Sequence, residues 1–318
     1  MKVAVIGSSG FIGSNLVNRL LTRGLRITCI DDFSRGKTSH FKGNNFVLKQ
    51  GSILNSDFLN TSLAGHDIVI HLAAINGTHN FYERPYEVFQ VSAEGTLNVI
   101  RACEKNKIKT LIYASSAEVY GDPEELPTSE NYSPKVNLSY NSRFSYGGGK
   151  LVGELMMNYM ARHLIERPIV FRPHNVYGPN MGDGHVIPQI IEKIIKGQRS
   201  SRGSNLTLEI QGDGTQTRSF AFIEDIVNGI EIIMNRGFPN ELYHIGNDFE
   251  ISILDLCRMI AELMNVKIEI KHAELLANSP RRRIPSIDKI KKLGYVPQFS
   301  LKDGLSQTLN WHIRSNFE

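Results

Sequence analysis

Three glycines directly behind a short apolar run constrain the fold of this chain more than any other feature. Val3–Ile6 is apolar and partly β-branched, as in a strand that is covered on both faces. Gly7, Gly10 and Gly13 follow it. Glycines at this spacing permit a sharp turn, close approach of the backbone to a pyrophosphate, and tight packing of a helix on a strand. We therefore predict a phosphate-binding turn and a helix over residues 11–22 whose N-terminus faces the phosphates.

Strands and helices alternate through the first 173 residues. Further strand patterns cover residues 25–30, 46–48, 67–74, 110–114 and 169–172, and the longest helical patterns cover residues 85–105 and 146–163. This alternation predicts an α/β fold, a Rossmann-type doubly wound parallel sheet. Residues 174–318 are expected to form mainly a smaller C-terminal substrate-binding lobe, with some segments returning to the sheet. In this lobe we expect a short strand at residues 206–210 and a basic turn at residues 281–283. We also expect four helices, at residues 188–196, 225–234 and 254–264 and from residue 301.

Composition and charge narrow the class of partner. The chain has 318 residues, 41% of them hydrophobic, and a formal charge of only +4 without a long basic run, which argues against nucleic-acid binding. Its cysteines, Cys29, Cys103 and Cys257, stand singly, so neither a disulfide framework nor a metal site is indicated. The chain passes directly into a strand and holds no apolar run of membrane-spanning length. We expect a cytoplasmic protein that does not enter the membrane.

An acidic pair ends the second predicted strand. Asp31 stands 18 positions after Gly13, near the distance at which a dinucleotide fold places an acid beside the adenosine ribose, and Asp32 follows it. This favours NAD as the cofactor over NADP. Arg35 leaves NADP as an alternative cofactor, because an arginine at this place could face its 2′-phosphate.

A tyrosine and a lysine share one face of a predicted helix. Tyr146 and Lys150 are four residues apart, and an ammonium beside a phenol lowers the phenol pKa from about 10 toward the range of a general base. Ser116, at a strand end, could donate to the same substrate oxygen. These three side chains suit removal of the proton of a secondary alcohol while its hydride goes to nicotinamide.

Six motifs make the chain similar to a known family. They are Gly7–Gly13, His71–Ala74, Ser115–Gly121, Tyr146–Lys150, Asn175–Pro179 and Gly212–Arg218. With them the chain resembles, over nearly its whole length, the extended short-chain dehydrogenases/reductases of the sugar-nucleotide epimerase and dehydratase family.

This resemblance implies roles for particular residues. Tyr146 would be the acid/base, Lys150 its pKa partner and a nicotinamide-ribose ligand, and Ser116 the hydroxyl that orients the alcohol. The implied NAD-binding residues are Gly7, Gly10, Phe11, Ile12, Gly13, Asp31, Asp32, Ser52, Ile53, Leu72, Ala73, Ala74, Tyr146 and Lys150. The implied ligands of the nucleotide sugar are Ser116, Asn175, Val186, Arg218, Arg282 and Arg283. Guanidinium groups suit this role because their planar fork matches phosphate oxygens.

The resemblance also implies a homodimer, formed through the helices at residues 85–105 and 146–163. Gly147–Gly149, in the gap between the tyrosine and the lysine, are unusually small, and we expect them to leave room for bulk on the sugar.

Residues 117 and 118 bear on the reaction. Family dehydratases carry Asp-Glu here, decarboxylases of UDP-glucuronate Ser-Glu, and GDP-mannose 3,5-epimerases a cysteine at the second position, whereas this chain has Ala117-Glu118. Simple 4-epimerases need no acid here. Glu118 is thus either a catalytic group or a neighbour with a structural role.

The sequence therefore predicts an NAD-dependent epimerase that inverts C4 of a UDP-hexose or UDP-hexuronate through a 4-keto sugar. Two alternatives stay open. One is a UDP-glucuronate decarboxylase, or another dehydratase or 3,5-epimerase, that uses Glu118. The other, from a different class, is a non-catalytic NAD-binding sensor.

Overall fold

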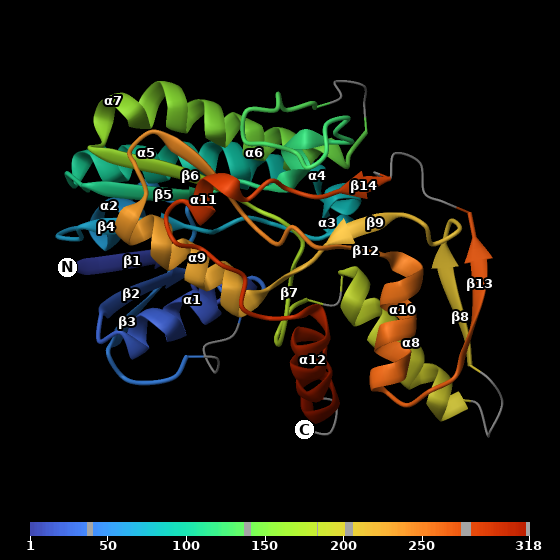
Figure 1. Ribbon diagram of the computed structural model, residues 1–318. Coiled ribbons are helices and arrows are strands. Elements are labelled where there is room, and N and C mark those ends of the chain that lie inside the picture. Colours follow the sequence, from blue (N-terminus) through green and yellow to red (C-terminus); the bar gives the residue numbers. More distant parts are fainter. Residues whose placement is uncertain (37–40, 137–140, 183, 201–205, 275–280, 316–318) are drawn as a thin grey trace.

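A parallel sheet of seven strands forms the centre of the computed structural model (Figure 1), which describes residues 1–36, 41–136, 141–182, 184–200, 206–274 and 281–315. The strand order is β11-β6-β5-β4-β1-β2-β3, and every neighbouring pair is parallel. The strands are β1 (Lys2–Ile6), β2 (Arg26–Asp31), β3 (Phe46–Gln50), β4 (Ile68–His71), β5 (Thr110–Ala114), β6 (Arg167–Pro173) and β11 (Glu241–Ile245). This confirms the predicted doubly wound sheet. The order in which strands are added to the sheet reverses between β1 and β4, which is where such sheets bind ligands.

Helices cover both faces of this sheet (Figure 1). Along β1, Val3 and Val5 pack in the apolar cluster that includes residues of α1 (Phe11–Thr22) and α9 (Ile223–Arg236). Ala4 and Ile6 point the other way, into the cluster that includes residues of α2 (Ser56–Ser62) and α5 (Thr96–Lys105). The strand is apolar throughout because its side chains alternate between two covered faces.

The two long predicted helices are present, and each contains a π-helical turn. The first consists of α4 (Pro85–Gln90), η2 (Val91–Gly95) and α5, and the second of α6 (Phe144–Met156), η4 (Met157–Ala161) and α7 (Arg162–Leu164). The short helix α3 (Thr78–Glu83) precedes them, and the 3₁₀ helix η3 (Ala117–Tyr120) follows β5. Among the described residues, no helix is both long and apolar enough to cross a bilayer.

The glycines between Tyr146 and Lys150 do not leave the expected space for a sugar. A β-carbon on Gly149 would lie 2.6 Å from the β-carbon of Ser92, and one on Gly147 would lie 2.9 Å from the carbonyl oxygen of Glu118. Both positions are therefore filled by neighbouring segments of the protein. Their smallness lets α6 pack closely against η2 and η3, and the expectation of extra substrate room is wrong.

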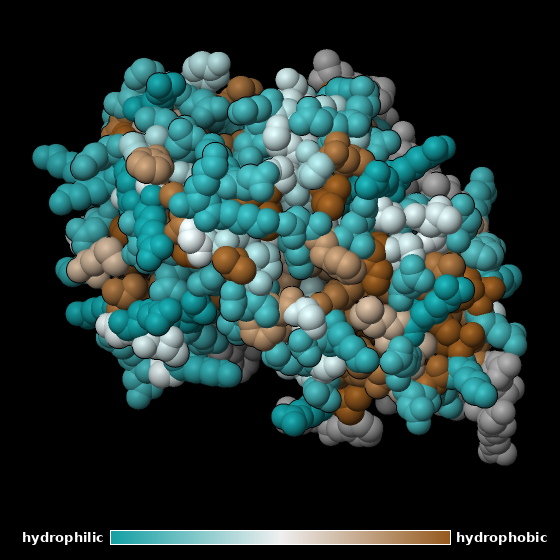
Figure 2. Space-filling view, viewed as in Figure 1, coloured by the Kyte–Doolittle hydropathy of each residue, from teal (hydrophilic) through white to brown (hydrophobic). Residues whose placement is uncertain are grey.

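The C-terminal part combines short strands and helices. Its strand pairs are β7 (Val176–Tyr177) with β10 (Ala221–Phe222), β8 (Leu206–Gln211) with β13 (Ile268–Ala273), and β9 (Thr217–Ser219) with both β12 (Glu250–Ser252) and β14 (Arg282–Arg283). Its helices are α8 (Val186–Ser200), α9, α10 (Ile253–Leu263), α11 (Asp288–Lys291) and α12 (Leu301–Ser315). The predicted basic turn is wrong for Arg282–Arg283, which pair in parallel with Thr217–Arg218. Figure 2 shows a largely hydrophilic surface, with hydrophobic side chains gathered over the region of α10 and β8.

Candidate active site

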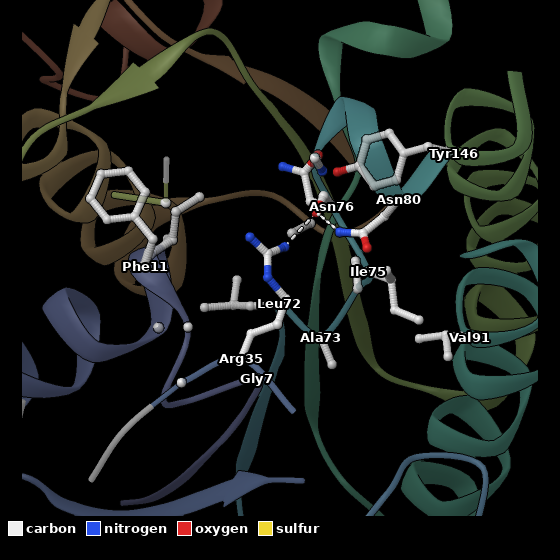
Figure 3. Close-up of a pocket in the computed structure, with 18 of the residues that line it drawn as sticks. Gly7, Phe11, Arg35, Leu72, Ala73, Ile75, Asn76, Asn80, Val91 and Tyr146 are labelled. Carbon is white, nitrogen blue, oxygen red and sulfur yellow. Dashed lines mark hydrogen bonds between the residues drawn. The ribbon is translucent and has the colours of Figure 1, made fainter. Parts of the chain in front are cut away.

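One cavity of about 950 Å³ lies where the strand order reverses, between β1 and β4. Every residue of the predicted NAD-binding set lines it, and so do Ser116, Glu118 and Asn175. Figure 3 shows side chains from both halves of the sheet facing this cavity, with Gly7 and Phe11 on one side and Asn76, Asn80 and Tyr146 on the other. The cavity thus brings the predicted cofactor residues and the predicted catalytic residues together.

The glycine turn at one end of the cavity has no space for a side chain at Gly7 or Gly13. Gly7 has φ +80°, and a β-carbon on it would lie 2.6 Å from the backbone nitrogen of Ala73. A β-carbon on Gly13 would lie 2.0 Å from the carbonyl oxygen of Gly7. Helix α1 starts beyond Gly10, its N-cap, without a side-chain cap and without an acidic residue in its first turn. Its first amides are therefore free to bind phosphate, as a dinucleotide requires.

Asp31 connects this turn to the end of β2. One of its carboxylate oxygens accepts a hydrogen bond from the backbone nitrogen of Ser9 and the other from that of Phe33, both at 2.8 Å. Burial raises the pKa of Asp31. Each oxygen keeps a lone pair for a further donor, so the carboxylate fits the ribose hydroxyls of a dinucleotide. The residues of this end of the cavity thus fit NAD.

Tyr146 lies on α6 at the other end of the cavity. Its ring is 6% exposed and stacks on Phe81 with a centroid distance of 4.9 Å, and its hydroxyl is hydrogen-bonded to Ser116. Ser116 also caps η3, because its hydroxyl oxygen accepts from the backbone nitrogen of Glu118 at 3.2 Å. Two independent contacts therefore fix the phenol and the hydroxyl that would share a substrate oxygen.

The pKa of Tyr146 differs from the prediction. Burial raises the pKa of Tyr146 to about 12, and the hydrogen bond from Ser116 only partly opposes this. Lys150 does not lower it here, because its ammonium donates to the carbonyl oxygen of Ala114 at 2.7 Å and lies 5.8 Å from the centre of the phenol ring. Burial lowers the pKa of Lys150 to about 7, with Glu154 opposing the shift.

Glu118 forms an ion pair with an arginine that is distant in sequence. Arg283 donates from Nη1 to its carboxylate at 2.6 Å, and Nη2 of Arg143 lies 3.8 Å from the other oxygen. Burial by itself would raise the pKa of Glu118, but the charge and hydrogen bond of Arg283, with the charges of Arg143 and Arg218, hold it below its usual range. Glu118 is therefore ionised at neutral pH, and it cannot supply a proton to a leaving hydroxyl.

The predicted substrate residues separate into two groups. Asn175 and Arg283 line the cavity, whereas Arg218, Arg282 and Val186 are not among the described residues that line it. Asn175 has φ +34° and donates to the carbonyl oxygen of Ser219 at 2.8 Å. Of the neighbouring predicted ligands Arg282 and Arg283, the structure places Arg283 at the cavity.

Arg218 and Arg282 make other contacts. Arg218 donates to the carbonyl oxygens of Thr217 and Arg281, and burial, with the charge of Arg283, lowers its pKa to about 10. Arg282 forms an ion pair with Glu250 at 2.7 Å, and its side chain is 55% exposed.

Behind the predicted catalytic residues lies a buried polar network that the sequence did not reveal. Arg172 of β6 binds Glu154 with two hydrogen bonds, Nε to Oε1 at 2.7 Å and Nη2 to Oε2 at 2.5 Å, and also donates to the hydroxyl of Tyr120. Tyr120 in turn is 2.6 Å from Nε2 of His244 on β11, and Ser115 donates to Glu154. Ser115 neighbours Ser116, and Glu154 lies one helical turn after Lys150. The network therefore holds the backbone that carries the predicted catalytic side chains.

Arg143 and Phe81 were also missed as site residues. Arg143 carried a local signal, because it stands one helical turn before Tyr146 and so shares its face. Phe81 reaches the cavity from a segment that carries no motif. Arg35, which the sequence offered only as a ligand of a 2′-phosphate, also lines the cavity.

Such a cavity suits hydride chemistry on a secondary alcohol, and together with this sheet it defines a short-chain dehydrogenase/reductase of the extended type. Within that class, the chain belongs to the NAD dependent epimerase/dehydratase family, whose model matches residues 3–246. NAD is accordingly its cofactor.

Comparison with curated proteins and solved structures agrees with this family. The chain is 32% identical over 318 residues to "UDP-glucuronic acid decarboxylase 1" of Xenopus tropicalis, covering 98% of this chain and 72% of the relative. It is 31% identical over 324 residues to a UDP-N-acetyl-alpha-D-glucosaminuronate decarboxylase of Bacillus cytotoxicus, covering 98% and 97%. A crystal structure of the UDP-glucose 4-epimerase of Thermotoga maritima with UDP-glucose superposes with a TM-score of 0.88 and 26% identity over 100% of both chains.

Proposed function

We propose that this protein is an NAD-dependent decarboxylase of a UDP-linked hexuronate. The observation that carries the proposal is the ionised Glu118, held by Arg283 and Arg143 beside Tyr146 in the cofactor cavity. Both relatives named above are decarboxylases of UDP-linked uronates and align with nearly the whole chain. The proposal replaces C4 epimerisation as the first choice.

Oxidation at C4 opens the reaction. Tyr146 takes the proton of the C4 hydroxyl while Ser116 holds the same oxygen by a hydrogen bond. When bound, NAD supplies the hydride acceptor and later the hydride donor. Burial raises the Tyr146 pKa to about 12, so deprotonation needs positive charge nearby. The charge of Arg35 acts in this direction, and Nζ of Lys150 lies 5.8 Å from the centre of the ring.

Loss of CO₂ follows from the chemistry of the 4-keto sugar. The C6 carboxylate is then β to a ketone, so the C5–C6 bond can break with its electron pair moving into the C4 carbonyl. Hydrogen bonds from Ser116 and Tyr146 stabilise the negative charge that forms on that oxygen. A proton added at C5 and hydride returned to C4 give a UDP-pentose, and the cofactor ends in its starting state.

The charge of the site supports an anionic substrate. Arg143, Arg218 and Arg283 all act on the single carboxylate of Glu118. A UDP-hexuronate carries both a diphosphate and a carboxylate, and guanidinium groups bind both. Elimination of water is disfavoured, because Ala117 has no acid and Glu118 has no proton to give.

Product analysis tests the proposal. Purified protein is incubated with NAD and, separately, UDP-glucuronate, UDP-N-acetylglucosaminuronate and UDP-glucose, and CO₂ and sugar products are measured. We expect CO₂ and a UDP-pentose from a uronate, without net NADH, and no product from the Tyr146→Phe variant.

A second candidate function is C4 epimerisation, which the full-length similarity to the Thermotoga maritima epimerase supports. A six-carbon product with inverted C4 and no CO₂ would establish that candidate and refute decarboxylation. Binding of NAD without turnover of any nucleotide sugar would indicate the sensor, against which the intact set of Tyr146, Lys150 and Ser116 stands.

We also propose a homodimer formed through α4 and α6 with η4. Four large apolar side chains are exposed there, namely Tyr86 at 71%, Phe89 at 45%, Leu155 at 47% and Tyr159 at 73%. A second copy would cover them. Light scattering should give twice the mass of one chain for the native protein and a single mass for a Tyr86→Asp/Tyr159→Asp variant. A monomeric native protein would refute the proposal.

A further inference from the structure

Arg35 crosses the cofactor cavity. It lies in the loop after β2, and its Nη1 donates to the carbonyl oxygen of Asn76, beyond β4, at 2.5 Å. Figure 3 shows the guanidinium inside the cavity, between the side of Gly7 and the side of Asn76. On a third side, a β-carbon on Gly182 would come within 3.3 Å of Nη2. One side chain therefore connects three segments that surround the cavity.

This position lies on the route of a dinucleotide. The ribose acid Asp31 is on one side, Tyr146 at the hydride end is on the other, and the phosphate-binding turn lies between them. A cofactor that extends from Asp31 to Tyr146 must place its pyrophosphate near this turn. The charge of Arg35 reaches the hydride end, where it acts to lower the pKa of Tyr146 and of His185.

The guanidinium is free to change partner. Its acceptor, the carbonyl oxygen of Asn76, also accepts from Nδ2 of Asn80 at 2.9 Å, so it stays hydrogen-bonded if Arg35 leaves. Among the ion pairs of the described residues, none involves Arg35. A cation with one neutral, replaceable acceptor gains most from an anion at this place.

We propose that Arg35 is a phosphate-binding residue of the NAD site, which exchanges the Asn76 carbonyl for the pyrophosphate oxygens and retains the bound cofactor. It does not serve a 2′-phosphate, because its guanidinium reaches toward Asn76 and away from the ribose acid. This assignment depends on the cofactor and not on the sugar reaction, so it stands or falls separately from the proposed decarboxylation.

The test measures binding without turnover. Trp311 is the only tryptophan of the chain and lines the cavity, so energy transfer from it to NADH reports binding directly. Nucleotide-free protein is titrated with NADH and NADPH, and ADP-ribose and adenosine compete with NADH. The variants are Arg35→Ala and Arg35→Lys, with Arg101→Ala, an exposed arginine on α5, as the matched control.

We expect Arg35→Ala to lower the affinity for NADH and ADP-ribose by about tenfold and to change the affinity for adenosine by less than about twofold. NADH should also be released faster. Arg35→Lys should fall between, and Arg101→Ala should match the native protein. Three results would overturn the assignment: unchanged ADP-ribose affinity, an equal loss for adenosine, or a loss confined to NADPH, which would place Arg35 at a 2′-phosphate instead.

Discussion

The two ends of the cavity are built in different ways. The cofactor end consists mainly of backbone: a glycine turn, the free amides of α1 and the segment after β4, with one carboxylate, Asp31. The substrate end consists of charged side chains, chiefly Glu118 and Arg283 with Arg143 beside them. Backbone geometry suits a cofactor that never changes, whereas side chains can be exchanged to suit a substrate. The two ends should therefore respond to different substitutions.

The largest effect on binding should come from Gly13→Ala, which breaks the cofactor end. Because the new β-carbon would lie 2.0 Å from the carbonyl oxygen of Gly7, α1 has to move. We expect the NADH affinity to fall by roughly 100-fold, which corresponds to about 2.7 kcal/mol. Titration of Trp311 fluorescence measures it. Gly148→Ala is the control, since among the described residues its β-carbon would meet only the Val136 side chain, at 3.6 Å, and it should bind NADH normally. Native affinity in the Gly13 variant would refute this account of the turn.

Arg283→Met should break the substrate end and leave the cofactor end intact. Its neighbour Arg282 provides a matched control, because it is exposed and paired with Glu250. We expect the KM for the nucleotide sugar to rise roughly 30-fold or more in Arg283→Met and to stay nearly constant in Arg282→Met. The NADH affinity should be unchanged in both. Equal effects of the two substitutions on KM would show that Arg283 has no special place at the site.

The network behind both ends should affect folding more than binding. Arg172→Met leaves the buried carboxylate of Glu154 without its cation, which should cost about 3–5 kcal/mol of unfolding free energy. Urea denaturation measures the loss. The double variant Arg172→Met/Glu154→Leu should recover part of it, because the carboxylate that lost its cation is then absent as well. If the double variant loses as much unfolding free energy as the Arg172→Met and Glu154→Leu single variants added together, Arg172 and Glu154 do not act as a pair.

The smallest effect should be a pH dependence due to Glu118. Its pKa in the folded protein lies below the unfolded value of 4.5, so just below pH 4.5 the unfolded chain binds more protons. The free energy of unfolding therefore rises with pH in that window, and the contribution is lost on acidification. Glu118→Gln should make this rise less steep and leave the slope unchanged above about pH 6, where its free energy of unfolding stays below the native value by the lost contribution. Urea denaturation at a series of pH values checks it, and an unchanged slope would contradict the ion pair.

The cofactor end could be predicted from the sequence, because its signals are local. Gly7, Gly10 and Gly13, the apolar run before them and Asp31 lie within three adjoining elements, and each has a recognisable spacing. Tyr146 and Lys150 were found for the same reason, since one helical turn separates them.

The substrate end could not be predicted in the same way. Glu118 and Arg283 are 165 residues apart, and the arginine is brought to the cavity by long-range pairing of its segment with β9 and with Thr128. The strand β11 was missed because Glu241 and His244 interrupt its apolar pattern, although it forms the edge of the sheet. The depressed pKa expected for Tyr146 was wrong, because spacing along a helix does not reveal burial or that Lys150 is hydrogen-bonded to Ala114.

The most direct test of the account follows the hydrogen at C4. A UDP-hexuronate with deuterium at C4 is converted by the enzyme with catalytic NAD, and the product is analysed by mass spectrometry and proton NMR. The account predicts a UDP-pentose that retains deuterium at C4, with one CO₂ for each sugar, and no conversion by Tyr146→Phe. A product that keeps six carbons, or one that loses the deuterium to solvent, would contradict it.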